Sequence, residues 1–169
     1  MLRRIRWAVQ IVLLLIVAAI LYIYLPQNDI VRVTGTQVVR ETRDANTTPP
    51  QVIDVRQIQT RTPDNQSIVY RNEDTGMGFP FYFKYSTDTL QADAQALISD
   101  EASPRWVVVT HYGLRSELMS MFPNAISIRE AEGPDETIIP WFNIVCIVVL
   151  IGLVLFIRRW FVRRFTRAA

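Results

Sequence analysis

Cysteine and histidine are almost absent from this 169-residue sequence, which contains one of each. The cysteine, Cys146, lies inside a long apolar run, so the chain can form no intrachain disulfide, and we interpret Cys146 as a packing residue. The histidine, His111, has no cysteine partners, and a lone histidine makes a poor metal site. We therefore expect no metal ion, no cofactor and no disulfide framework.

Motifs that bind nucleotides or carry out catalysis are also lacking. The Gly-Met-Gly sequence of residues 76–78 has neither the lysine nor the spacing of a phosphate-binding loop. His111 lies near Ser116 and Glu117 in the sequence, and a catalytic triad is a spatial arrangement that sequence alone leaves open. Because no nucleophile-elbow pattern is present, the sequence favours a non-enzymatic protein with no catalytic residue and a structural, hydrogen-bonding histidine.

Two long apolar runs are the strongest positive feature of a chain that is 50% hydrophobic. Residues 7–25 contain 18 apolar residues out of 19, residues 138–157 contain 17 out of 20, and neither run contains a charge. A helix of about 20 residues spans roughly the 30 Å of a bilayer's hydrocarbon core. We predict a transmembrane helix for each run. The first run ends without the small residues that signal-peptide cleavage requires, so we predict an uncleaved anchor.

Charge is distributed unevenly around the two runs. The terminal segments 1–6 and 158–169 hold eight arginines and no acidic residue. Residues 26–137 hold the other ten basic residues and all sixteen acidic ones, which leaves −6. Basic flanks stay in the cytoplasm, so we predict cytoplasmic termini with residues 26–137 on the other side of the membrane. The basic tails would contact anionic lipid, and the acidic middle segment disfavours nucleic acid as a partner.

The cytoplasmic tails are too short to hold an output domain, which excludes an autonomous signalling receptor. The middle segment, in contrast, is long enough for one compact domain with its own core. Alternating and helical apolar patterns predict its elements. The predicted strands are 29–40 (with Gly35 as a bulge or turn), 52–58, 68–71, 79–85, 105–112 and 125–129; the predicted helices are 89–99, with Asp88 as N-cap and Gln91 as its capping-box partner, and 114–121. This order predicts an α+β domain with a mixed or antiparallel sheet, flanked by the two transmembrane helices.

Residues 79–85 contain five aromatic side chains. Phe79, Phe81, Phe83 and Tyr85 would share one face of a period-two strand, and we expect that face to pack on the core. The alternative is an aromatic loop that touches the bilayer or a partner subunit, as exposed aromatic patches do.

A candidate interaction surface follows from the polar loop 71–78, the aromatic segment 79–85 and the corner 111–115. If these three segments converge in space, their polar and aromatic side chains form one patch. The candidate residues are Arg71, Glu73, Asp74, Phe81, Tyr82, Lys84, His111, Tyr112 and Arg115.

Several segments resemble one bacterial membrane family. They are residues 25–31 (LPQNDIV), 69–76 (VYRNEDTG), 104–113 (PRWVVVTHYG), 122–125 (FPNA) and 138–143 (IIPWFN). Over nearly the whole chain the sequence is similar to the family catalogued as domain of unknown function fifteen twenty-three, found mainly in alphaproteobacteria. The resemblance implies a bacterial inner-membrane protein with a periplasmic domain, and it transfers no catalytic residue.

Three functional hypotheses follow. The leading one is a non-enzymatic accessory, assembly or stabilising subunit that docks on a larger membrane complex through its periplasmic domain. The second is a periplasmic ligand-binding module that uses the three converging segments as pocket walls and signals through a partner. The third is a hydrolase that uses His111.

Overall fold

The computed structural model describes residues 2–44, 51–116, 118 and 121–166. The chain divides into two compact units, residues 1–137 and residues 138–169. The first unit contains helix α1 (Leu2–Tyr24), five strands and a short helix, and the second contains helix α3 (Trp141–Thr166).

Both long helices expose apolar side chains along most of their length. Within them, Trp7–Tyr24 and Trp141–Trp160 are long and apolar enough to cross a membrane, which agrees with the two predicted spans. The second helix begins at Trp141 rather than at the predicted residue 138. Pro140 precedes it, and proline, which lacks a backbone N–H, is well tolerated at the start of a helix.

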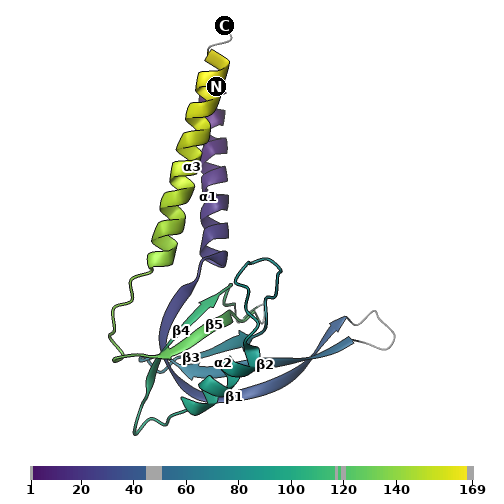
Figure 1. Cartoon of the computed structure of the whole chain (residues 1–169), viewed down its shortest axis with the longest axis vertical. Coiled ribbons are helices and arrows are strands. Elements are labelled where there is room, and N and C mark those ends of the chain that lie inside the picture. The colour runs from purple at the N-terminus through teal and green to yellow at the C-terminus, as the bar shows by residue number, and fades with distance from the viewer. Residues whose placement is uncertain (1, 45–50, 117, 119–120, 167–169) are drawn as a thin grey trace. The chain divides into compact units, whose positions relative to one another are not determined.

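The strands of the first unit close into a small barrel (Figure 1). They are β1 (Gln27–Asp44), β2 (Gln51–Arg61), β3 (Ser67–Asn72), β4 (Trp106–Tyr112) and β5 (Asn124–Glu130). Their order around the barrel is β1-β2-β3-β5-β4, and β1 closes it by pairing with β4. All pairs are antiparallel except β3 with β5. The predicted mixed sheet is confirmed, but its closure was not predicted.

This strand order, with helix α2 (Thr87–Ala96) between β3 and β4, is that of the oligonucleotide- and oligosaccharide-binding (OB) fold. The core contains apolar side chains from the strands and α2, with Val31, Ile58 and Tyr70 completely buried. Many functions share such a fold, so the fold alone assigns none to this chain.

Strands β1 and β2 continue past the barrel as a two-stranded arm (Figure 1). From residue 33 onward β1 pairs only with β2, and residues 51–55 of β2 pair only with β1. The register shifts between Val33 and Gly35, which confirms the predicted bulge at this glycine. A bulge bends and twists a strand, and this one lies just after Arg32, where the pairing of β1 with β4 ends.

The N-terminus of α2 differs from the prediction. Ser86, and not Asp88, occupies the N-cap position, and it makes no side-chain capping bond. The cap comes from another segment, because Asp74 Oδ1 accepts hydrogen bonds from the Thr87 backbone N–H (3.1 Å) and hydroxyl (2.5 Å). Asp88 lies inside the helix and forms an ion pair with Arg56. A carboxylate at this end also favours the helix dipole.

Two predicted elements are wrong. Residues 79–85 form an irregular loop and not a strand, because Pro80 lacks an N–H and no neighbouring strand pairs with this segment. The described part of the predicted helix 114–121 is a turn, in which Ser116 and Met121 exchange backbone hydrogen bonds of 3.0 and 2.9 Å. Glu117 and residues 119–120 lie outside the described residues.

Candidate functional site

The three segments singled out in the sequence meet beside the end of α1. The loop after β3 and the segment after β4 line a cavity of about 500 Å³. Its walls combine Arg71, Glu73 and Asp74 with the apolar side chains of Ile23, Phe79 and Leu114. The lining of the cavity therefore combines charged and apolar side chains, a combination that suits an amphipathic ligand or a protein side chain.

The end of α1 is bonded to both segments. The Gly113 N–H donates to the Ile23 carbonyl (2.9 Å), and the Tyr82 hydroxyl donates to the Tyr24 carbonyl. The Tyr24 and Phe79 rings meet edge to face, with centroids 4.6 Å apart. Gly113 has a φ of +103°, a conformation that favours glycine. Because β1 begins at residue 27, the helix and the barrel are joined without a flexible linker.

The charge of Arg71 is already compensated. Its guanidinium donates to Glu73 (3.0 Å) and to Glu41 on β1 (3.0 Å). Burial opposes the charged form, but these two carboxylates outweigh it and raise the pKa of Arg71 above its ordinary value. Arg71 therefore ties β1, β3 and the following loop together, and it offers no unpaired charge to an anion.

The aromatic side chains of the loop divide into two sets. Tyr82 points inward and stacks on Tyr112, with ring centroids 4.9 Å apart. Tyr112 in turn receives a hydrogen bond from Asn124 (3.1 Å), and burial raises the pKa of its phenol. Phe81, next to Tyr82, is 63% exposed. The prediction that the aromatic face packs on the core is wrong, because its phenylalanines point outward.

Lys84 is the single lysine of the chain and is buried, with 5% of its surface exposed. Its ammonium donates to Asn72 Oδ1 (2.6 Å) and to the Ala125 carbonyl (2.7 Å). Burial lowers its pKa to about 8, although Asp74 and Glu73 act in the opposite direction. Lys84 therefore fixes the loop to β3 and β5 and does not belong to the exposed surface on which it was predicted.

Lys84 should give the barrel a measurable pH dependence. Its lowered pKa means that the folded chain binds this proton less tightly than the unfolded chain. The free energy of unfolding should therefore rise from about pH 8 toward pH 10, by less than about 1.4 kcal/mol per pH unit. Near pH 10 the rise should end, because burial raises the pKa of the Tyr70 phenol and ionisation then favours the unfolded chain.

Urea unfolding of the full chain in mild detergent, followed by near-ultraviolet circular dichroism across this pH range, measures the effect. Lys84→Met should abolish the rise while leaving the decline above pH 10. Equal slopes in the two proteins would show that Lys84 does not titrate in this range.

His111 belongs to a partly buried polar cluster that the sequence did not reveal. Its Nε2 lies 3.0 Å from Asp29 Oδ2, and the same oxygen accepts a hydrogen bond from the Tyr70 hydroxyl (2.6 Å). Burial works to raise the pKa of Asp29, but the bonds from His111 and Tyr70 outweigh it and lower the pKa. His111 Nδ1 has no hydrogen-bond partner among the described residues. This arrangement agrees with a structural histidine.

The remaining candidate residues bind the protein's own backbone. Arg115 donates to the Ser67 carbonyl (2.9 Å). Asn124, which was not predicted, forms a reciprocal pair with the backbone of Glu73, through bonds of 2.9 and 3.0 Å. Asparagine directly after Pro123 at the start of a strand was the available signal.

The described residues contain no group of three or more His, Cys, Asp or Glu side chains placed to hold a metal ion. What they present is a surface: a partly charged cavity, an exposed aromatic loop and the arm.

Comparison with known proteins gives a family but no activity. Residues 2–166 match the family described as "Protein of unknown function (DUF1523)". A protein of Haemophilus influenzae named "Uncharacterized protein" is 39% identical over 145 residues, which cover 80% of this chain and 82% of that protein. No solved structure matches the chain.

Proposed function

The chain belongs to the DUF1523 family, and from that premise we propose that it is a non-enzymatic, two-span bacterial inner-membrane protein that acts as an accessory, assembly or stabilising subunit. The barrel would lie in the periplasm and dock on another membrane complex. Anionic lipid and that complex would be its partners. The α1 and α3 helices, each long and apolar enough to cross a membrane, would be its anchors.

The proposed orientation is supported by the charges. Eight arginines and no acidic residue lie in the terminal segments, whereas the barrel and its connections carry −6. The positive-inside rule then leaves both termini in the cytoplasm. Because the end of α1 is bonded directly to the barrel, the barrel would stand at the membrane surface and extend its arm from there.

The observation that carries the docking role is the arm. Its strands pair only with each other, so each has an outer edge available to a further strand. Val38 and Val52 lie on the same face of the arm and are 59% and 55% exposed. The exposed ion pair of Arg40 and Asp54 lies between them. An exposed apolar pair around a charged pair is the pattern of a specific protein contact.

The test is purification of the tagged full-length protein in mild detergent, followed by native mass measurement and identification of co-purifying chains. We expect a stoichiometric membrane-protein companion. Val38→Glu with Val52→Glu should reduce its recovery by roughly tenfold or more, because two buried charges would face the companion. The matched variant Val38→Thr with Val52→Thr keeps shape and strand propensity and should retain most of the companion.

A wild-type protein that purifies without another chain would contradict the docking role. So would a companion that both double variants retain equally.

A second candidate function is binding of an amphipathic ligand. It is favoured by the cavity beside α1, whose lining contains charged and apolar side chains. In that case the native mass of the chain would include a small-molecule adduct and no companion.

A further inference from the structure

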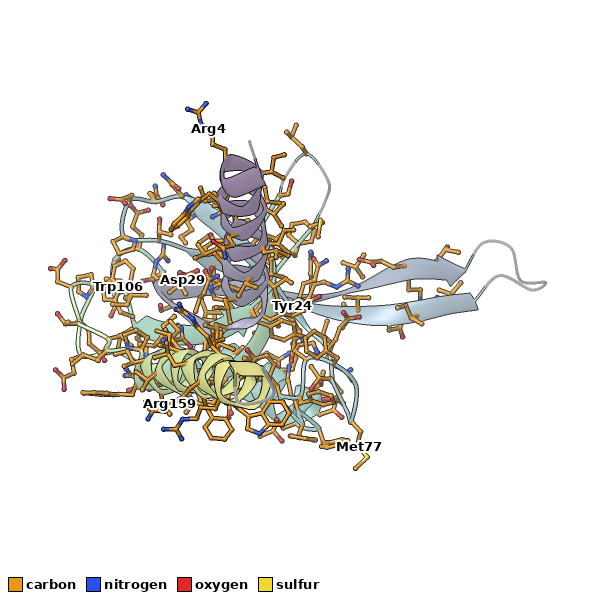
Figure 2. The ribbon with its side chains drawn as sticks, turned by 90° about the horizontal axis from the view of Figure 1, so that it is seen from above. Arg4, Tyr24, Asp29, Met77, Trp106 and Arg159 are labelled. Carbon is orange, nitrogen blue, oxygen red and sulfur yellow. The ribbon has the colours of Figure 1, made fainter. Side chains whose placement is uncertain are left out.

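The loop between β3 and α2 carries an unusual outward face. We call residues 76–85 the aromatic loop. Met77 is 79% exposed and, in Figure 2, lies at the outer edge of the molecule and points away from it. The other outward side chains are Phe79, Phe81, Phe83 and Tyr85, each between 58% and 64% exposed. Contiguous exposed apolar side chains of this size mark a binding surface.

No charge lies on this face. Lys84 is the one charged residue of the aromatic loop, and its ammonium is turned inward to Asn72 and Ala125. Part of the loop's backbone is also bonded internally: the N–H groups of Thr75 and Gly76 donate to the Lys84 carbonyl, and that of Lys84 donates to the Thr75 hydroxyl. Satisfied polar groups and outward apolar ones are what contact with lipid requires.

The fold holds these side chains outward. Tyr82, half-buried between the exposed Phe81 and Phe83, stacks on Tyr112 and donates to the Tyr24 carbonyl. Phe83 has a φ of +48°, a left-handed conformation that is unfavourable for a bulky residue. Such a conformation persists only where the surroundings determine it. The exposure of the phenylalanines is therefore a property of the folded loop.

The aromatic loop is in direct contact with the end of the proposed span. Ring contacts connect Tyr24 to Phe79 (4.6 Å), Phe79 to Phe81 (5.7 Å) and Phe81 to Phe83 (6.2 Å). Figure 1 shows the loop beside the lower end of α1. Aromatic side chains near the ends of membrane helices lie at the level of the lipid headgroups. The first ring of the loop contacts a tyrosine at this level.

We propose that the aromatic loop inserts into the headgroup region of the membrane leaflet at which α1 ends. This inference rests on the proposed function, because it requires α1 to cross the membrane. The occupant of the patch is lipid, since the outward face offers a protein no charge and few polar groups, and since it is continuous with the end of the span. The insertion would give the barrel a contact with the membrane in addition to the α1 and α3 anchors.

Site-directed spin labelling of the full chain tests this. In a Cys146→Ala background, single cysteines replace Phe81 in the loop, Asp64 in the turn between β2 and β3, and Leu14 within α1, and each is labelled with a nitroxide. The proteins are reconstituted into vesicles of phosphatidylethanolamine and phosphatidylglycerol. Accessibility to oxygen, which concentrates in lipid, is compared with accessibility to a water-soluble nickel complex. All three positions are exposed, so the labels should not disturb packing.

We expect the label at Phe81 to be several-fold less accessible to nickel than the label at Asp64, and more accessible to oxygen. The label at Leu14 should be accessible to oxygen and not to nickel. A Phe81 label as accessible to nickel as the Asp64 label, with Leu14 in lipid, would overturn the insertion alone. Exclusion of both reagents from Phe81, or spin coupling between copies, would overturn it in favour of a protein partner. A Leu14 label accessible to nickel would instead contradict the span.

Discussion

Replacing Asp29 with alanine is expected to lower the free energy of unfolding by about 1–3 kcal/mol. Asp29 Oδ2 is the common partner of the Tyr70 hydroxyl (2.6 Å) and His111 Nε2 (3.0 Å), and Tyr70 is completely buried. The substitution leaves both groups without this partner inside the barrel. Urea unfolding of the full-length protein in mild detergent at neutral pH measures the loss.

A matched control is Asp54→Ala, which removes an exposed carboxylate 3.3 Å from Arg40 on the arm. Exposed ion pairs contribute little, so this variant should lose about 1 kcal/mol or less. Adding Tyr70→Phe to Asp29→Ala should recover part of the stability, because it removes the unpaired hydroxyl. Equal losses at Asp29 and Asp54 would contradict a structural role for the cluster.

The same cluster predicts an acid dependence. The pKa of Asp29 is lower in the folded chain than its ordinary value of 3.8. The stability that its ionised form contributes is therefore complete above about pH 4 and is lost as the pH falls through the lower, folded pKa. Asp29→Ala should lack this component of acid unfolding.

The features that depend on local pattern could be predicted from the sequence. The two uncharged apolar runs correspond to α1 and α3, and the alternation around Val31, Val55 and Ile68 corresponds to strands. The predicted strand 105–112 corresponds to β4, which pairs with β1 and β5. Gly35 indicated the bulge because a glycine inside a strand pattern often marks one.

The features that depend on long-range pairing could not be predicted from the sequence. The alternation of Phe79, Phe81 and Phe83 has the period of a strand, but a strand needs a neighbour, and the barrel closes without this segment. The period instead comes from a loop whose alternate residue, Tyr82, is fixed to Tyr24 and Tyr112. The cap of α2 was missed for a similar reason, because Asp74 is thirteen positions from the N–H it binds.

The candidate site was predicted as a place more accurately than as a set of residues. The three segments do converge, but Lys84 and His111, chosen for their chemistry, are buried in it. For Lys84 the sequence held a signal of burial, because Lys84 is the only lysine among eighteen basic residues and lies within an aromatic segment. For His111 it held none, because the acidic partner, Asp29, is far away in the chain.

Asn72→Leu is expected to have the largest effect on stability, a loss of about 3–5 kcal/mol. Asn72 is 1% exposed, and its amide nitrogen donates to the Thr87 carbonyl and to Gln91 Oε1, each at 2.9 Å. Its oxygen accepts from the Lys84 ammonium (2.6 Å). Leucine has the same branched side-chain skeleton but no polar atom, so three buried groups, one of them charged, would lose this partner. Urea unfolding in mild detergent measures the loss.

Gln91→Met provides a graded control, because it removes one acceptor of the same amide and should cost about 1 kcal/mol. The two variants should also differ in hydrogen exchange. Without Asn72, Lys84 loses one of its two described partners, so the N–H groups of Thr75 and Gly76, which bond to the Lys84 carbonyl, should exchange faster. In Gln91→Met they should stay protected. Similar losses and similar exchange in both variants would mean that Asn72 does not hold the aromatic loop.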